Sequence, residues 1–428
     1  MVAALILLIL LIQATPAAVF ADGPVIRGVL TLVIAAALGI VSTVARARET
    51  AHVLRVLRFP LLLLLLPAAW MLVQLMPIPL RWSNSIWNAA AEAGDAGSFG
   101  HMTVDVGATV IAIVRYLTAV GILMVAATTT VDRSRAEWLI HWLTAATAFL
   151  ATILLAHAFF GLFPLADTRA TTALHAASGL GILIAAAATI RAVERYETRR
   201  NRAEMSPAKF AWTLAAGLSA LTLCWLALLL AAPARVTFAA ACGFVTILLI
   251  LVTRRFALPP LGAACLGVLT VVGALAIITT ESKTTADATL RFALASPPAV
   301  SIVERMIADN LSGTGGGTFG ALLPVYRGID EPGLSEDAPT TAAQLEIEMG
   351  RLAPWTVALL ALVVLGFLLR GALNRGRDSF YPTAAAGCVV TLTIEAFIDA
   401  SLLGTTVMIL STASLGLGLA QSASRSLL

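Results

Sequence analysis

The chain has 428 residues, of which 59% are hydrophobic and only 12% are charged. Soluble globular proteins carry roughly 25% charged residues, so this composition excludes an ordinary water-soluble protein of this size. The net charge of +4 comes almost entirely from arginines in short segments between apolar blocks, whereas a nucleic-acid-binding protein would gather its charge on an exposed domain.

The apolar residues fall in blocks of about 20, which is the helix length that spans the core of a bilayer. Some stretches, such as 61–66, contain no polar side chain and cannot form an amphipathic surface helix. Val19-Phe20-Ala21 resembles a signal-peptide cleavage site, but no Lys or Arg precedes the first block, which favours a retained helix. The blocks predict an all-α polytopic membrane protein with twelve transmembrane helices, at 3–21, 25–44, 58–76, 107–128, 137–160, 171–192, 210–231, 236–252, 258–280, 354–370, 382–399 and 402–421.

Basic residues indicate which side of the membrane each connection occupies. Most of the 28 Lys and Arg lie in the C-terminal tail or in and beside the segments 45–57, 129–136, 193–209, 253–257 and 371–381. Twelve spans place all of these segments on one side, which the positive-inside rule makes cytoplasmic, together with both termini. The chain then divides into helices one to nine (1–280), a large loop on the other face (281–353) and helices ten to twelve (354–428).

The 281–353 loop is long enough to have structure and a function of its own. Apolar residues at helical spacing predict a helix over 299–310, lying on the membrane or on the transmembrane bundle. A second helix is predicted over 339–350, with Asp337 as its N-cap and Pro339 in its first turn.

A glycine-rich run lies between these two predicted helices and contains Gly313, Gly315 and Gly317. It favours either a tight turn that stops the first helix or a backbone whose amide groups approach a ligand. A nucleotide-binding P-loop is excluded, because no Gly-Lys-Ser/Thr follows. The four cysteines lack metal-ligand spacing, so neither a metal site nor a disulfide is predicted.

Several charged residues on the outer face lie where a purely structural role would not require them. Arg115 lies inside a predicted span, where it either reaches the outer interface or faces the bundle interior and has a function there. Arg235 begins a span at the outer surface and either anchors it or clamps a ligand. Glu395 and Asp399 share one helical face; Asp399 is placed to end the helix, and the deeper Glu395 to pair with an arginine or accept a proton. The basic residues expected on this face, nearly all arginines suited to bidentate contact with phosphate, are Arg27, Arg81, Arg115, Arg169, Arg235, Lys283, Arg291, Arg305, Arg327 and Arg351.

Three motifs resemble the O-antigen ligase and polymerase superfamily, whose members have about twelve helices and one large periplasmic loop between helices nine and ten. The run 306–319, MIADNLSGTGGGTF, is similar to the family's loop helix and glycine turn, and Tyr326-Arg327 follows it. The run 344–350 resembles the family helix that ends in Glu-x-Gly, and the run 74–79 resembles its Gln-Leu-x-Pro-x-Pro. Where the ligases have a loop histidine this chain has Pro339, which favours a polymerase over a ligase and leaves an inactive relative open.

The resemblance implies transfer of a glycan from a polyprenyl diphosphate to an acceptor hydroxyl, at the periplasmic face of a bacterial inner membrane and without a cofactor. Partners would be the lipid-linked oligosaccharide, membrane lipid and other polysaccharide-assembly proteins, with no nucleic acid. The implied diphosphate ligands are Arg235 and Arg291, with Arg305, Arg327 and Arg115 as helpers. The remaining candidate bases are Glu395, Glu348 and Asp309, and the loop residues expected near the site are Gly313, Gly315, Gly317 and Tyr326.

Two other classes fit part of the pattern. A secondary transporter would also have twelve spans with a basic segment midway, here 193–209, but it would not need so long an outer loop. A non-catalytic component of a polysaccharide-assembly complex is suggested by Pro339, which can neither accept nor donate a catalytic proton. His101, His157 and His175 are the histidines that could replace the missing base.

Overall fold

The computed structural model describes residues 1–44, 47–93, 99–163, 168–200, 207–256, 287–327, 337–374 and 378–422. Within them, eight helices are long and apolar enough to cross a membrane, which confirms an all-α multi-pass membrane protein. These are α3 (Pro24–Val44), α4 (Ala47–Gln74), α6 (Val106–Thr129), α7 (Arg133–Phe160), α8 (Thr168–Arg200), α9 (Pro207–Ala231), α10 (Ala234–Arg255) and α15 (Ala353–Asn374). The predicted helix 258–280 lies outside the described residues.

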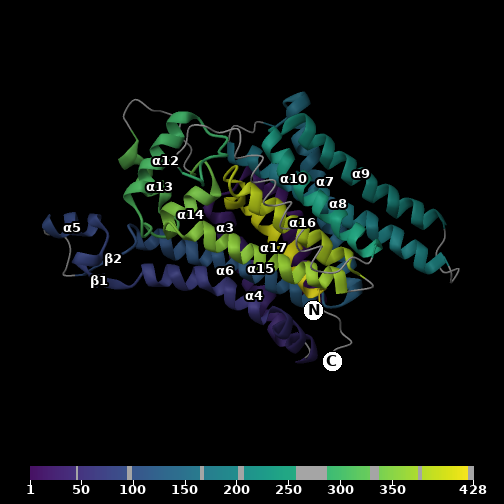
Figure 1. Ribbon diagram of the computed structural model, residues 1–428. Coiled ribbons are helices and arrows are strands. Elements are labelled where there is room, and N and C mark those ends of the chain that lie inside the picture. Colours follow the sequence, from purple (N-terminus) through teal and green to yellow (C-terminus); the bar gives the residue numbers. More distant parts are fainter. Residues whose placement is uncertain are drawn as a thin grey trace.

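Helix α8 forms the centre of the bundle. In an apolar stretch of 18 residues of α8, 83% of the residues are buried, against 22% in the corresponding stretch of α3 at the periphery. It packs against α7, α9 and α10 and against two shorter helices, α16 (Phe380–Glu395) and α17 (Thr405–Ala420). Small residues permit these close contacts: Gly181 of α8 faces Cys224, and Gly243 of α10 faces the backbone of Gly387 in α16. Figure 1 shows these helices side by side.

The first predicted span is two helices rather than one. Helix α1 (Val2–Gln13) ends before Ala14, and α2 (Thr15–Phe20) follows it. Pro16 has no backbone N–H to continue the helical ladder, and the Thr15 hydroxyl donates to the Ile12 carbonyl over 2.7 Å instead. The single helix predicted over 3–21 is therefore wrong.

The last two predicted spans are also shorter than expected. Helix α16 ends at Glu395 instead of residue 399, and a short 3-10 helix, η2 (Ser401–Leu403), leads to α17. The N-terminal amides of a loop helix explain the early end. Thr341 donates to the Asp399 carbonyl over 2.9 Å, and Ala342 donates to the Ala396 carbonyl over 2.8 Å. These bonds satisfy carbonyls that would otherwise lack a partner after the helix ends.

The long loop forms a small helical unit with its own core. It contains α12 (Pro297–Asp309), α13 (Phe319–Tyr326) and α14 (Thr341–Met349). Met306 of α12, Phe319 of α13 and Ile347 of α14 are all buried together. The apolar face of α12 thus packs against the other loop helices, not against the membrane or the transmembrane bundle as predicted.

The start of α14 corrects a second prediction. Its N-cap is Thr340, whose hydroxyl accepts from the Ala343 amide over 3.1 Å, and Pro339 precedes the helix instead of lying in its first turn. Asp337, predicted to be the N-cap, forms an ion pair with Arg169 of α8. A long-range charge contact has therefore replaced the expected local one.

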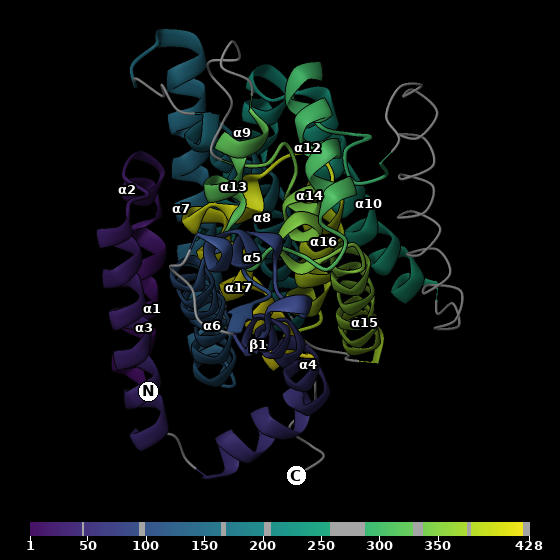
Figure 2. The ribbon, with the colours of Figure 1, turned by 90° about the vertical axis from the view of Figure 1, so that its left-hand side faces the viewer.

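The segment between α4 and α6 joins this helical unit. It contains strands β1 (Pro77–Pro79) and β2 (Phe99–His101), paired antiparallel, with the 3-10 helix η1 (Leu80–Trp82) and α5 (Ser85–Glu92) between them. Val104 donates to the Thr314 carbonyl over 2.7 Å, which links the two segments. Both lie at one end of the bundle, at the left in Figure 1 and in front in Figure 2; we call it the loop end.

Arginines gather at the opposite end, where α7 and α16 begin and α8 approaches its end. Arg133 pairs with Asp378 over 2.8 Å, and both Arg191 and Arg195 pair with Glu137. Arg254 also bonds to Ser379 there. Described residues of four of the arginine-rich segments thus share this end, namely 129–136, 193–209, 253–257 and 371–381.

Candidate functional site

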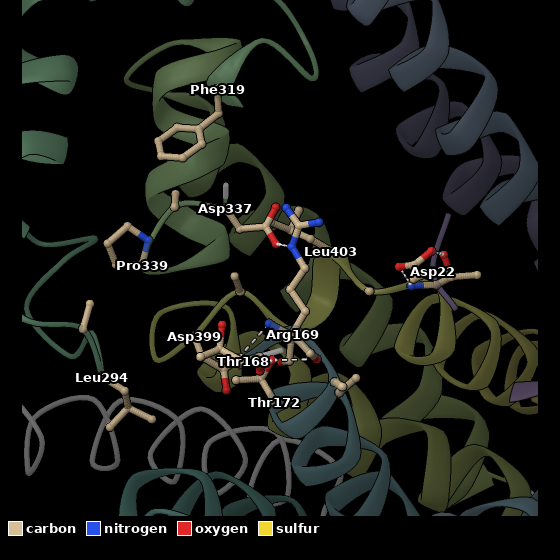
Figure 3. Close-up of a pocket in the computed structure, with 18 of the residues that line it drawn as sticks. Asp22, Thr168, Arg169, Thr172, Leu294, Phe319, Asp337, Pro339, Asp399 and Leu403 are labelled. Carbon is tan, nitrogen blue, oxygen red and sulfur yellow. Dashed lines mark hydrogen bonds and ion pairs between the residues drawn. The ribbon is translucent and has the colours of Figure 1, made fainter. Parts of the chain in front are cut away.

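A cavity of about 620 Å³ lies at the loop end, between the transmembrane bundle and the loop helices. Its walls come from the α2–α3 turn, α6, the first turns of α8, the loop, and the connection between α16 and α17. Apolar side chains such as Phe20, Leu294 and Val303 form part of the lining. Figure 3 shows that the charged lining residues project from several separate elements.

Asp22 and Arg27 form one ion pair in the cavity wall, with 2.9 Å between Arg27 Nε and Asp22 Oδ1. The Thr405 hydroxyl and amide, at the start of α17, also donate to the Asp22 carboxylate, over 2.6 and 3.3 Å. Burial alone would raise the pKa of Asp22, but the bonds from Arg27 and Thr405 outweigh it, and the pKa lies below the ordinary value. Asp22 therefore fastens the α2–α3 turn to α17 as a carboxylate.

Arg169 and Asp337 form a second ion pair, which joins the start of α8 to the loop. In Figure 3 the Arg169 guanidinium points at the Asp337 carboxylate above Thr172. Burial raises the pKa of Asp337, although Arg169, Arg115 and Arg27 all act to lower it. The attraction of three arginines thus does not fully offset the loss of water around this carboxylate.

Arg115 is the third cavity arginine, and it comes from the first half of α6. It is half-buried, and no hydrogen bond or ion pair joins it to another residue of the described ranges. At long range Arg27 repels it, and Asp22, Asp337 and Glu348 attract it. A half-buried guanidinium without a close carboxylate is a suitable ligand for an anion entering the cavity.

Asp399 supplies a carboxyl group to the cavity lining. It is 4% exposed, and its Oδ1 accepts from the Ser401 amide over 2.9 Å. Glu395 lies one helical turn deeper, is fully buried and does not line the cavity. Neither Glu395 carboxyl oxygen has a hydrogen-bond partner among the described residues, so it does not pair with an outer arginine there.

The glycine-rich segment binds an internal carboxylate. Gly317 and Phe319 donate their amides to the two carboxylate oxygens of Glu348, over 2.8 and 3.3 Å, and Gln344 donates over 2.9 Å. Burial nevertheless raises the pKa of Glu348, although these bonds act to lower it. Gly313, Gly315 and Gly317 all have positive φ, and none of them lines the cavity. Positive φ at these glycines agrees with the tight turn, which was one of the two structures predicted for this segment.

The other arginines expected to hold a diphosphate lie outside the cavity lining. Arg235 donates to the backbone carbonyls of Phe292 and Ala293, over 3.0 and 3.2 Å. Arg291 is half-buried, with no hydrogen-bond partner for its Nε among the described residues. Arg305 is exposed on α12, and Arg327 is half-buried after α13. Of the five arginines predicted for the site, the structure places only Arg115 in this cavity.

The remaining candidates also lie away from the lining residues. Asp309 is exposed at the end of α12. Tyr326 is half-buried, and its hydroxyl accepts from the Asn310 side chain over 3.3 Å. His101 and His157 bond to the backbone carbonyls of Leu75 and Phe163, over 2.9 and 2.8 Å. His175 does not line the cavity either.

Arg27 and Arg169 were expected on the outer face but not in the site. Their positions could have indicated the site, because each lies in the first turn of a helix that begins at the loop end. Within the described ranges, no group of three or more His, Cys, Asp or Glu side chains could hold a metal ion.

Comparison with known proteins adds no identity to this site. No family model matches the chain, and no curated protein matches it.

Proposed function

We propose that this protein transfers a glycan from a polyprenyl diphosphate to an acceptor hydroxyl in the cavity at the loop end. The observation that supports this most is Arg115, a guanidinium without an ion-pair partner in the described ranges, in a cavity that also contains Arg27 and Arg169. Three arginines and an apolar wall suit a ligand with a diphosphate head and a lipid tail. The reaction type comes from the resemblance of residues 306–319 and 344–350 to the O-antigen ligase and polymerase superfamily.

In this proposal the arginines stabilise the leaving group. The acceptor oxygen forms a bond to the anomeric carbon while the bond from that carbon to the diphosphate oxygen breaks, and the electron pair leaves with the diphosphate. Arg115, Arg169 and Arg27 oppose the growing negative charge from their positions in the cavity lining. Asp399, whose carboxyl group is in the lining, accepts the proton from the acceptor hydroxyl.

Arg235 has a positioning role in this scheme. It holds the carbonyls of Phe292 and Ala293, and the next residue along the chain, Leu294, belongs to the cavity wall. Exposed Phe20 and Leu294 give this wall an apolar rim where the first isoprene units of the lipid would lie. The loop end is then the periplasmic face of a bacterial inner membrane, because the arginine-rich end fits the cytoplasmic side.

The test compares polymer formation in cells that carry Arg115→Gln or Arg305→Gln in place of the natural chain. We expect Arg115→Gln to abolish most polymer, and Arg305→Gln, on the exposed face of the same loop end, to leave polymer length and amount unchanged. Normal polymer with Arg115→Gln, at wild-type protein levels in the membrane, would refute the role of the cavity.

The lipid-linked intermediates of a deletion strain would separate the alternatives. Accumulated single repeat units indicate a polymerase, and assembled but unattached chains indicate a ligase. No change in glycolipids would point to transport or to a non-catalytic assembly role, and would count against glycan transfer.

A further inference from the structure

The Asp337 carboxylate lines the same cavity as the three arginines. It forms an ion pair with Arg169 and is attracted by Arg115 and Arg27. These arginines belong to three transmembrane helices, α8, α6 and α3, whereas Asp337 belongs to the loop. A carboxylate from the loop thus faces the guanidinium of Arg169 in the cavity lining (Figure 3).

The two cavity carboxylates that pair with arginine are held to different degrees. Asp22 accepts from Arg27 and twice from Thr405, and the net effect lowers its pKa. For Asp337 the loss of water dominates, and its pKa is raised in spite of the arginines around it. The Asp22 carboxylate also joins the α2–α3 turn to α17 through Thr405, whereas Asp337 belongs to the loop just before the anchored helix α14. An anion that enters the cavity can therefore replace Asp337 at Arg169 without separating two transmembrane elements.

We propose that Asp337 is a stand-in anion, which occupies the arginine site in the empty protein and is displaced from Arg169 by a phosphate group of the ligand. This deepens the proposed function, on which it rests for the identity of the natural ligand. Phosphate has the charge and the oxygen acceptors to replace a carboxylate at a guanidinium.

The anchoring of α14 limits how far the loop moves when Asp337 is released. Thr340 donates to the Thr289 carbonyl over 2.9 Å, and Thr341 donates to the Asp399 carbonyl through its amide and its hydroxyl. These bonds hold the helix in place without Asp337. Release therefore affects the short stretch 337–339, which lines the cavity, and ligand binding is coupled to the position of this stretch.

Binding of inorganic pyrophosphate to the full-length protein in lipid nanodiscs tests this, with affinity measured by calorimetry. Asp337→Asn keeps the shape of the side chain and removes the competing charge, so we expect pyrophosphate to bind about tenfold more tightly, equivalent to about 1.4 kcal/mol. Arg169→Gln should weaken binding by a similar factor. The matched control is Asp309→Asn, because Asp309 is an exposed carboxylate on the same loop. This variant should bind pyrophosphate with unchanged affinity.

Unchanged or weaker binding by Asp337→Asn would overturn the proposal, as would an equal gain from Asp309→Asn, which would indicate a general charge effect. If Asp337→Asn does not fold, the double variant Arg169→Gln, Asp337→Asn replaces it. It should bind pyrophosphate more tightly than Arg169→Gln alone, because the remaining carboxylate no longer repels the ligand. Weaker binding by the double variant would also refute the stand-in role.

Hydrogen exchange gives a second readout. The Ala338 amide, 3.4 Å from the Gln344 side-chain oxygen, should exchange faster when pyrophosphate binds, and should already exchange fast in ligand-free Asp337→Asn. No change at this amide would contradict displacement.

The two proposals can fail separately. Pyrophosphate binding that follows this pattern, together with normal polymer from Arg115→Gln, would refute glycan transfer and leave the stand-in role intact. Loss of polymer from Arg115→Gln, with no effect of Asp337→Asn on pyrophosphate affinity, would refute the stand-in role and leave the glycan-transfer proposal intact.

Discussion

Replacement of Glu348 by alanine should loosen the glycine-rich segment of the loop while the transmembrane helices remain folded. Glu348 is only 7% exposed, and its carboxylate accepts the amides of Gly317 and Phe319 and the Gln344 side chain. Alanine would remove the acceptor for all three donors. Because the site is buried, water cannot readily replace the carboxylate.

The size of the effect follows from the two backbone amides. A buried donor left without an acceptor costs about 1–3 kcal/mol, so two amides cost about 2–6 kcal/mol. The Gln344 side chain is only partly buried and can turn toward water, so it adds little. Local opening of the segment should therefore become easier by about 2–6 kcal/mol. Glu348→Gln keeps one carbonyl oxygen as an acceptor, so its free energy of local opening should lie between those of the natural chain and Glu348→Ala.

Hydrogen exchange measured on the purified protein checks this directly. The amides of Gly317 and Phe319 should be protected in the natural chain and should exchange at least tenfold faster in Glu348→Ala. Asp309→Ala, an exposed carboxylate of the same loop, is the control and should leave both amides protected. Equal protection of these amides in the natural chain and in Glu348→Ala would refute the reasoning, because it would mean that the carboxylate is not their partner.

Three further changes have definite expected outcomes. Glu395→Met should raise the free energy of unfolding in detergent by about 1–3 kcal/mol, because it removes a fully buried carboxyl group without a described partner; an unchanged denaturation midpoint would contradict this. Gly315→Ala should lower the free energy of unfolding by at least about 1–3 kcal/mol, because φ is +107° and an added Cβ would collide with Thr103. An unchanged free energy of unfolding would mean that the turn can relax. Since burial raises the pKa of Asp337 above 3.8, the folded protein holds this proton more tightly than the unfolded chain. The contribution of Asp337 to stability is then greatest below pH 3.8 and declines as pH rises through the raised value, and in Asp337→Asn the unfolding temperature should lose this part of its pH dependence.

The transmembrane part of the fold could be predicted because it depends on composition over long stretches. A block of about 20 apolar residues has few alternatives to a helix in a bilayer. The helix ends depend on single contacts, and there the predictions were less accurate. Pro16 divides the first helix, and the Thr341 and Ala342 amides cap the carbonyl end of α16 from the loop. The first of these signals is local and was visible in the sequence, whereas the second requires the tertiary structure.

The N-cap of α14 shows the same limit at one residue. Asp337 was the predicted cap, and Thr340, which has an equally suitable side chain, is the cap in the structure. Arg169 lies far away in the sequence, and its guanidinium takes the Asp337 carboxylate, which leaves Thr340 as the cap. The cavity was missed for a related reason, because Arg27, Arg115 and Arg169 come together only when α3, α6 and α8 pack at one end of the bundle.

The glycine-rich segment and the cavity arginines bind different carboxylates. Glycine-rich backbone can bind phosphate through its amides, but here two of those amides bind Glu348 inside the loop. Those two amides already have a partner, so in the proposed function anion binding is the task of side chains. In this proposal, guanidinium groups on separate helices have one advantage over backbone amides, because a loop carboxylate such as Asp337 can compete with the ligand for them. If this division is correct, Gly317→Ala should weaken pyrophosphate binding only as far as it unfolds the loop, whereas Arg115→Gln should weaken binding in a protein whose loop amides keep their protection.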